Sequence, residues 1–217
     1  MACKKSYTPC IIPYLGVLSK RFFVINWKKI WSYHAPFHKD GVSKIPLKNG
    51  KHLILKAGPG FGDLSHPTTA LCLDFLSQLL NPSGYTTCVD MGTGTGILAI
   101  AAALLGAKKV YAYEIDPEAI LHAKENIALN GLEGSICLNP EEPPPSFDLL
   151  LFNMISSEQQ VALESHPFLS HSNHTRIVSG ILTEQENGYL KKSPHGKIVS
   201  RKQEGDWVAY TFRYGSY

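Results

Sequence analysis

The chain has 217 residues, of which 44% are hydrophobic and 18% are charged, a composition that excludes the disordered and fibrous classes and is typical of a soluble globular protein. This length suits one large α/β domain and is short for two. No apolar run reaches the roughly 20 residues of a membrane span, and the interrupted N-terminal run lacks a signal-peptide cleavage site. We therefore expect a cytoplasmic protein.

Positive charge is concentrated at the start of the chain. The net charge is +3, yet residues 1–56 contain eleven Lys or Arg and a single acidic residue, Asp40. We expect this segment to be a basic N-terminal extension, with the main domain at 57–217. A basic arm on an acidic body indicates recruitment by RNA or by an acidic protein surface. Alternatively, its lysines only keep a short two-stranded extension solvated.

Helical and strand-like patterns alternate after the basic segment. Helices are expected at 66–81, 97–106 and 117–131, and Asp116 is suited to cap the last of them. Strands are expected where short runs of apolar and β-branched residues occur, at 86–91, 109–115, 135–138, 147–153, 176–180 and 208–214.

The order of these elements predicts the sheet. Strand, helix and strand in repeated succession predict parallel pairing with right-handed crossovers. The runs at 109–115 and 147–153 lack alternation, so we expect central strands covered on both faces. The turn signal Gly205-Asp206 precedes the last strand and indicates a terminal hairpin, hence one antiparallel strand.

The sequence GTGTG at 92–96 follows the first of these strands and opens the helix at 97–106. Ligands of open α/β sheets bind at this edge, where helix N-termini and small residues expose backbone. A phosphate-binding P-loop is excluded, because the motif lacks the Gly-Lys-Ser/Thr that contacts phosphate and magnesium. The GxGxG spacing by itself only weakly distinguishes a loop that binds a dinucleotide, which usually has GxGxxG, from a loop that binds another nucleoside cofactor.

The charge of Asp90, two residues before Gly92, separates these cofactors better. Its carboxylate would repel the pyrophosphate of a dinucleotide, but would attract the ammonium and sulfonium groups of S-adenosylmethionine. We therefore expect S-adenosylmethionine to bind here, with contacts at Asp90, Gly92, Gly94 and Gly96.

Two further polar residues stand at strand ends on the same edge. Glu114 lies where a carboxylate accepts both ribose hydroxyls of a nucleoside cofactor. Asn153 ends the run FDLLLFN, and its amide is suited to hold a substrate amine or the amino-acid end of the cofactor. It is our candidate catalytic residue; a plain turn residue is the alternative.

No metal site is expected. The five cysteines show no CxxC spacing, and we interpret them as free buried thiols. His171 and His174 lack a partner ligand at metal-binding spacing, and we expect them in a solvated loop.

Several stretches together resemble the PrmA family, bacterial methyltransferases that act on ribosomal protein L11. They are NWKKIW (26–31), HPTT (66–69), DMGTGTGILAIAA (90–102) with YEIDPEAI (113–120), FNMI (152–155), SGILTEQ (179–185) and EGDWVAYTFR (204–213). The resemblance implies a Rossmann-like, seven-stranded class I methyltransferase sheet whose last strand is antiparallel. It also implies cofactor contacts at Thr69, Gly92, Glu114 and Asn153.

The function implied by this resemblance is S-adenosylmethionine-dependent N-methylation of lysine or α-amine groups of a protein, ribosomal protein L11 or another small protein. The alternatives are an RNA or small-molecule methyltransferase and a cofactor-binding module without catalysis. FNMI stands where methyltransferases of planar base amines have an NPPY-type motif, which argues against a base as acceptor.

The chain departs from the family pattern in three places, one of which is HSNHTRIVSGIL (171–182), where the family has a Gly-rich turn before its fifth strand. The family usually has FGTGTHPTT, whereas this chain has FGDLSHPTT, with Asp63 and Leu64 in a loop near the cofactor. Only about 25 residues precede Asn26, where the family has a domain that recognises its protein substrate. We expect the basic extension to replace that domain.

Overall fold

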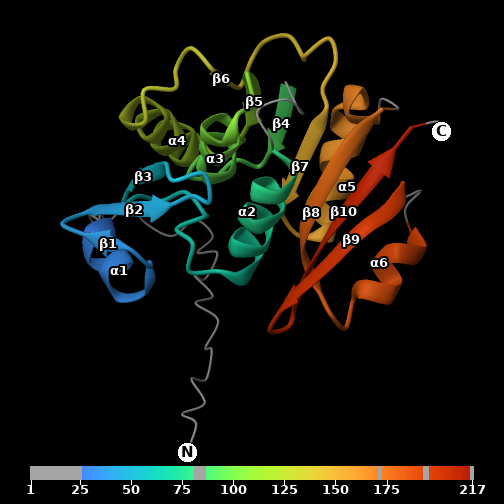
Figure 1. The fold of residues 1–217 in the computed structure, drawn as a ribbon, viewed down its shortest axis with the longest axis horizontal. Coiled ribbons are helices and arrows are strands. Elements are labelled where there is room, and N and C mark those ends of the chain that lie inside the picture. The colour runs from blue at the N-terminus through green and yellow to red at the C-terminus, as the bar shows by residue number, and fades with distance from the viewer. Residues whose placement is uncertain (1–25, 81–86, 171–172, 193–195, 216–217) are drawn as a thin grey trace, which may run out of the picture.

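The computed structural model describes residues 26–80, 87–170, 173–192 and 196–215. A seven-stranded sheet has the order β6-β5-β4-β7-β8-β10-β9, and a three-stranded sheet has the order β1-β2-β3 (Figure 1). The large sheet comprises β4 (Thr87–Met91), β5 (Lys109–Tyr113), β6 (Ile136–Leu138), β7 (Leu149–Asn153), β8 (His174–Leu182), β9 (Lys197–Glu204) and β10 (Trp207–Tyr214).

The strand directions confirm the predicted fold class. The pairs β4–β5, β5–β6, β4–β7 and β7–β8 are parallel, whereas β10 is antiparallel to both of its neighbours, β8 and β9. β9 and β10 form the predicted hairpin, with Glu204 paired to Trp207 across the turn. The carboxyl ends of β4, β5 and β7 therefore meet at one edge, as the sequence predicted.

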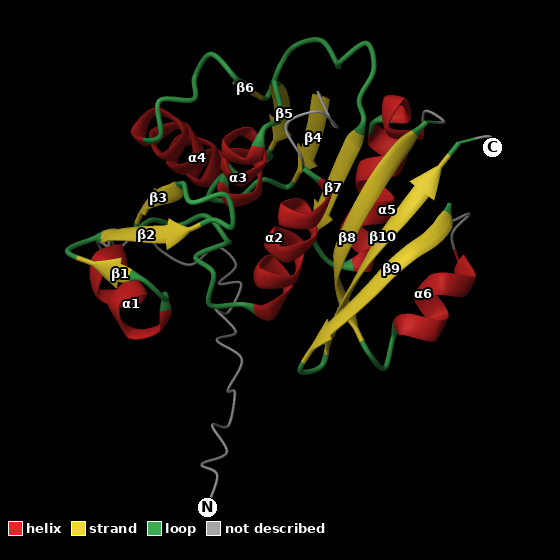
Figure 2. Cartoon of the chain, in the orientation of Figure 1, coloured by secondary structure: helices red, strands yellow, loops and turns green. Residues whose placement is uncertain are grey.

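Helices cover both faces of this sheet (Figure 2). α2 (Pro67–Leu79) and α3 (Ile97–Leu105) pack in the same core cluster as Leu149, Leu151 and Ile177. α5 (Ser156–Ser165) and α6 (Glu186–Lys192) contribute to the second cluster, with the alternate residues Leu150 and Phe152. β7 is buried on both faces, which explains its uninterrupted apolar run.

α4 (Pro117–Leu129) begins as expected, because the Asp116 side chain accepts a hydrogen bond from the Glu118 N–H. Its inner face is partly polar. Asn126 accepts a hydrogen bond from the Lys56 N–H at 2.8 Å and donates to the Thr95 carbonyl at 2.9 Å. This buried amide joins the small sheet to the glycine loop at 92–96.

The described part of the basic extension shares the main core. It forms α1 (Trp27–His34), β1 (His38–Lys39), β2 (Val42–Pro46) and β3 (His52–Lys56), and β3 packs against α3 and α4. Trp31, Ile45, Leu53 and Leu55 are buried in the same cluster as α2 and α3. The sheet has three strands, not two, and the domain boundary at residue 57 stays a prediction.

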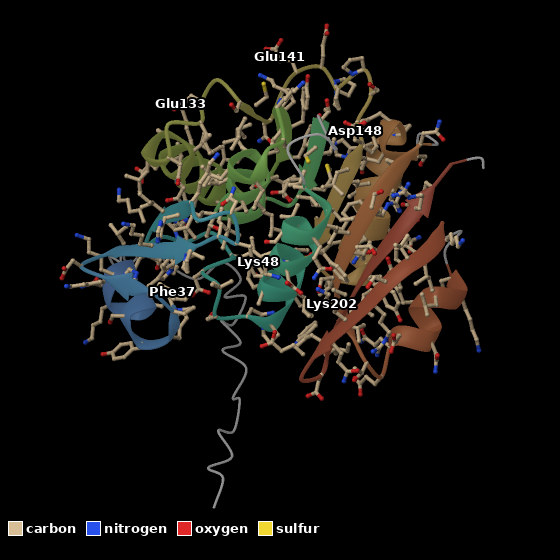
Figure 3. The ribbon with its side chains drawn as sticks, in the orientation of Figure 1. Phe37, Lys48, Glu133, Glu141, Asp148 and Lys202 are labelled. Atoms are coloured by element: carbon tan, nitrogen blue, oxygen red, sulfur yellow. The ribbon has the colours of Figure 1, made fainter. Side chains whose placement is uncertain are left out.

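Ion pairs add to this attachment. Asp74, on α2, pairs with Lys48 of the small-sheet segment and with Lys202 of β9, and Figure 3 labels both lysines. The Asp74 carboxylate therefore links α2 both to the small-sheet segment and to β9. None of the helices in the described residues is long and apolar enough to cross a membrane.

The expectation of a solvated loop is wrong for His174. β8 begins at this residue, and the His174 ring is buried and stacks on Tyr214 with centroids 4.7 Å apart. Backbone pairing of His174 with Tyr214 of β10 extends the strand beyond the predicted start at residue 176. His171 lies outside the described residues. Cys72 and Cys88 are free and buried, as expected; Cys137 is free and only partly buried, and Cys3 and Cys10 also lie outside the described residues.

Candidate cofactor and active site

The glycine loop, residues 92–96, turns sharply between β4 and α3. Gly92, Gly94 and Gly96 have φ values of +73°, +55° and +84°, in the left-handed region that residues with a β-carbon disfavour. The N–H groups of Gly92 and Thr93 both donate to the Tyr113 carbonyl at 2.9 Å. The loop is thereby fixed beside the end of β5.

A second segment, which we call the crossing loop (residues 57–65), lies directly on the glycine loop. The Phe61 carbonyl accepts a hydrogen bond from the Thr95 N–H at 2.8 Å, and the Gly62 carbonyl accepts one from the Thr95 hydroxyl at 3.0 Å. A β-carbon at Gly94 would lie only 2.4 Å from the Phe61 oxygen. Gly94 is therefore required by this contact within the chain, and its role toward a cofactor stays a prediction.

Gly96 has a structural reason of its own. It is the N-cap of α3 with φ of +84°, whereas a β-carbon there would make only ordinary contacts, 3.4 Å to the Ile100 side chain and 3.7 Å to Ala123. A β-carbon at Gly92 would lie 2.5 Å from the terminal methyl of Met154. At Gly92, therefore, the atom that a β-carbon would clash with belongs to a flexible side chain just after β7.

Glu114 follows β5, and hydrogen bonds hold its carboxylate in place. One oxygen accepts from the Gly94 N–H at 2.9 Å, and the other accepts from the N–H groups of Ile115 and Asp116 at 2.8 and 3.1 Å. The Asn139 side chain bonds both the N–H and the carbonyl of Glu114, at 2.9 and 2.8 Å. Carboxylate oxygens have further lone pairs, so this acceptor can still bind hydroxyl donors.

Asp90 is almost completely buried, with 1% of its surface exposed. Its carboxylate accepts a 2.6 Å hydrogen bond from the Thr93 hydroxyl and another from the Ala99 N–H. Burial raises the pKa of Asp90 to about 6, and the Glu114 charge acts in the same direction. Among the described residues no cationic side chain forms an ion pair with it. At neutral pH the site therefore contains a buried negative charge without a counter-ion.

Thr69 and Asn153, far apart in sequence, meet at the same edge. The Asn153 amide nitrogen donates to the Thr69 hydroxyl at 3.2 Å, and Thr69 is fully buried in the first turn of α2. The side-chain oxygen of Asn153, Oδ1, is buried and has no hydrogen-bond partner in the described part of the chain. Buried acceptors are normally satisfied, so this oxygen favours a ligand with an N–H donor.

An aromatic group flanks the N-terminus of α2. The His66 ring contacts Phe61 and Trp207, with centroid separations of 5.5 and 4.7 Å, and Phe61 is 54% exposed. His66 is the N-cap of α2, and its Nδ1 lies 2.8 Å from the Thr68 hydroxyl. Burial lowers its pKa. Phe61 and Trp207 were not predicted as site residues, although both lie in or next to the motifs that carry the family resemblance.

These observations fit S-adenosylmethionine. The uncompensated charge of Asp90 matches a cationic ligand, the Asn153 oxygen matches an ammonium or amine donor, and the Glu114 carboxylate matches a ribose diol. The same charges oppose a pyrophosphate. The roles of individual site residues stay predictions.

Comparison with known proteins agrees with this chemistry. The family model for ribosomal protein L11 methyltransferase (PrmA) matches residues 37–214. The chain is 35% identical over 215 residues to the ribosomal protein L11 methyltransferase of Carboxydothermus hydrogenoformans, covering 92% of this chain and 68% of the relative. It is 33% identical over 210 residues to that of Geobacter sulfurreducens, covering 87% and 66%. The chain thus spans about two thirds of the length of these relatives.

Solved structures have the same architecture. A ribosomal protein L11 methylase from Lactobacillus delbrueckii superposes with a TM-score of 0.59 at 30% identity, covering 70% of this chain and 80% of that one. An RNA methyltransferase from Salinibacter ruber, solved with S-adenosyl-L-homocysteine, has a TM-score of 0.53 at 15% identity, which supports the fold alone. The predicted methyltransferase class and cofactor, S-adenosylmethionine, are confirmed, and the chain belongs to the PrmA family of ribosomal protein L11 methyltransferases.

Proposed function

We propose that this chain methylates a lysine or α-amine nitrogen of a protein in the cytoplasm, either ribosomal protein L11, as the names of its relatives indicate, or another small protein. The observation that carries the proposal is the buried side-chain oxygen Oδ1 of Asn153, which has no hydrogen-bond partner among the described residues. It lies beside Thr69 and at the same edge of the sheet as Glu114. An acceptor amine brings the N–H donor that this oxygen lacks.

When bound, S-adenosylmethionine supplies a methyl group on a positively charged sulfur. The chain's own residues hold and orient the reactants. Asp90, Gly92, Gly94 and Gly96 form the cofactor side of the site, and the Asp90 carboxylate stabilises positive charge next to the glycine loop. The Glu114 carboxylate accepts hydroxyl hydrogens of the ribose, and Thr69 fixes the Asn153 amide.

The acceptor nitrogen must be neutral to attack. For a lysine with a pKa near 10.4, loss of the proton at pH 7 costs about 4.6 kcal/mol, and a nearby positive charge reduces this cost. The Asn153 oxygen accepts an N–H of the neutral amine and thereby directs its lone pair. Alignment of two reactants contributes about 7 to 11 kcal/mol in well-oriented systems, so positioning alone supplies much of the catalysis.

The test offers a labelled methyl donor with purified ribosomal protein L11, with bulk cytoplasmic protein and with total RNA. Label in a protein band that resists RNase and is lost in Asn153→Ala supports the proposal. Glu118→Gln, a change of an exposed carboxylate on α4, is the matched control and should keep full activity. Label only in RNA, or cofactor binding without any labelled product, would replace the proposal by one of the two alternatives.

RNA contact through the basic extension is part of the proposal. Among the described residues of this extension, Lys28, Lys29, Lys39, Lys44 and Lys51 form no ion pair with a carboxylate. Lys28 and Lys29 line a shallow groove of about 530 Å³ with Ser32 and His38, and with Asp40 as its acidic member. Unpaired lysines beside exposed aromatic rings, such as Tyr33 at 75% exposure, suit a phosphate backbone with unstacked bases.

Binding of a fluorescent single-stranded RNA at several salt concentrations tests this contact. Reversing two charges, Lys28→Glu with Lys29→Glu, should weaken binding and lower the salt dependence by about two phosphate contacts. Lys109→Glu, on β5, is the control. Removing residues 1–25 should leave the affinity for S-adenosylmethionine intact and reduce activity on the acceptor; loss of both would place that arm in the cofactor domain.

A further inference from the structure

We propose that Asp63, through its pair with His34, positions the crossing loop on the glycine loop and thereby sets the affinity for the cofactor. The inference rests on the proposed function for the identity of the ligand.

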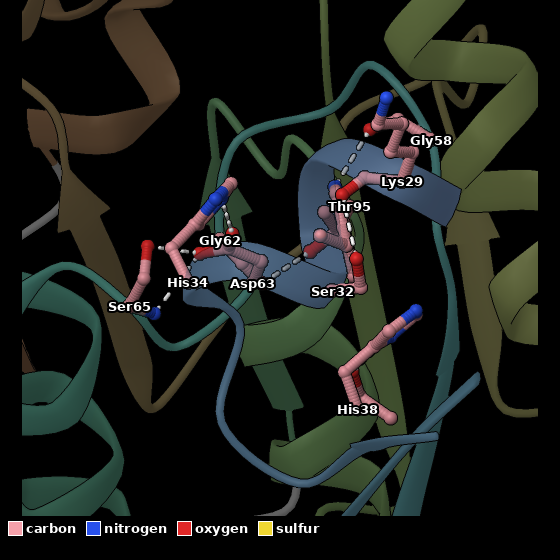
Figure 4. Close-up of polar contacts among 11 residues, drawn as sticks. Lys29, Ser32, His34, His38, Gly58, Gly62, Asp63, Ser65 and Thr95 are labelled. Atoms are coloured by element: carbon pink, nitrogen blue, oxygen red, sulfur yellow. Dashed lines mark hydrogen bonds and ion pairs between the residues drawn. The ribbon is translucent and has the colours of Figure 1, made fainter. Parts of the chain in front are cut away.

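At the Asp63 carboxylate, α1 meets the crossing loop (Figure 4). One oxygen of Asp63 lies 2.6 Å from Nε2 of His34, the last residue of α1. The other oxygen accepts hydrogen bonds from the N–H and the hydroxyl of Ser65, at 2.9 and 2.6 Å. Asp63 is 9% exposed, so this carboxylate is largely shielded from water. It fixes the end of the crossing loop both to α1 and to the turn that leads into α2.

The residues just before Asp63 contact the glycine loop directly. The Phe61 and Gly62 carbonyls receive the N–H and the hydroxyl of Thr95, and the neighbouring Gly94 N–H bonds the Glu114 carboxylate. A shift of the crossing loop therefore changes the position of the N–H that holds Glu114. The chain of contacts runs from α1 to the acidic residue expected to bind ribose.

The crossing loop needs this anchor because its backbone is strained. Leu64 has a φ value of +70°, a left-handed conformation that is unfavourable for a residue with a β-carbon. The two hydrogen bonds from Ser65 and the pair with His34 hold Leu64 in place.

Calorimetric titration with S-adenosylmethionine tests the inference. His34→Gln and Asp63→Asn should each weaken binding by about fivefold, and the double variant should match the single ones because the pair acts as a unit. Glu125→Gln removes an ion pair with Lys56 in the same region and should change nothing.

Hydrogen exchange of the Thr95 amide provides a readout that needs no cofactor. This amide donates to Phe61, so it should exchange faster in Asp63→Asn than in the parent and in Glu125→Gln. Unchanged exchange together with unchanged affinity, or additive losses in the double variant, would overturn the inference. Faster exchange in Asp63→Asn, together with a parent protein that binds no S-adenosylmethionine, would instead overturn the proposed function and keep the positioning of the loop.

Discussion

The Gly94 N–H donates a 2.9 Å hydrogen bond to the Glu114 carboxylate, which joins the glycine loop after β4 to the end of β5. The same carboxylate also accepts two backbone N–H groups at the start of the turn into α4. The residue expected to recognise ribose is thus part of the framework that shapes the glycine loop, so recognition and loop shape depend on one side chain.

Glu114→Gln should weaken binding of S-adenosylmethionine by about 1.5 to 3 kcal/mol, because hydrogen bonds to a charged acceptor are lost. Glutamine keeps the size of the side chain but has one acceptor oxygen where the carboxylate has two, so part of the backbone hydrogen bonding around the glycine loop is lost as well. Calorimetry with the parent, Glu114→Gln and the exposed control Glu118→Gln measures the effect. An unchanged dissociation constant in the first variant would refute the assignment.

Asp90→Asn should make the ligand-free protein more stable and the complex weaker. Burial raises the folded-state pKa of Asp90 to about 6, above its unfolded value, so the ionised form costs stability at neutral pH. This cost disappears as the pH falls below about 6. At pH 7.5 the substitution should increase the free energy of unfolding by about 1 to 3 kcal/mol.

Urea unfolding of the parent and Asp90→Asn from pH 7.5 to 5 measures this effect, and the stability difference between them should shrink as the pH falls. Titration with S-adenosylmethionine should give weaker binding for the variant. A variant that is less stable at pH 7.5 and binds the cofactor equally well would show that Asp90 has only a structural role.

His122 should make the fold sensitive to acid. Its Nδ1 accepts the Gly60 N–H at 3.0 Å and its Nε2 lies 2.7 Å from the Lys56 carbonyl, an arrangement that fits the neutral ring. Burial lowers its pKa in the folded state, so the unfolded chain binds the proton more tightly. Stability from His122 is therefore present at pH 7.5 and is lost as the pH falls below the usual histidine range. Comparison of unfolding in the parent and His122→Gln at pH 7.5 and 5.5 should give a larger difference at pH 7.5.

Thr69→Val should reduce methylation mainly through Asn153. Valine has a similar shape to threonine but cannot accept the Asn153 N–H, so the amide loses its fixed orientation. The turnover rate should fall by about tenfold, the equivalent of one hydrogen bond, and Asn153→Ala should cost at least as much. Single-turnover rates with saturating cofactor measure the effect; a change confined to cofactor affinity would assign both residues to cofactor binding alone.

The large sheet was predictable because its signals are local. Alternating strand and helix patterns imply parallel strands, and parallel strands bring Glu114 and Asn153 to one edge without any knowledge of packing. The apolar run at 147–153 correctly indicated a strand buried on both faces. The predicted start of β8, residue 176, is wrong because β8 begins at His174. The His174 ring stacks on Tyr214, a residue 40 positions away that no local sequence pattern links to it.

The crossing loop was not predictable, because its contacts join segments distant in the sequence. Phe61 contacts Thr95, and His122 contacts Gly60 across 62 residues. Burial in the small sheet has a two-residue period, since Ile45, Leu53 and Leu55 are buried and their neighbours are more exposed. The sequence shows this period only in part, because the outward positions include the apolar residues Val42, Pro46 and Ile54. The prediction for this segment rests on the charge of its lysines and not on the two-residue period of burial.

Calorimetric titration of the purified chain with S-adenosylmethionine, S-adenosylhomocysteine and NAD at pH 7.5 tests the central claim most directly, namely that the uncompensated charge of Asp90 selects a cationic nucleoside. The account predicts binding of S-adenosylmethionine that weakens in Asp90→Asn, and no binding of NAD. Binding of NAD with no uptake of S-adenosylmethionine or its product would contradict it.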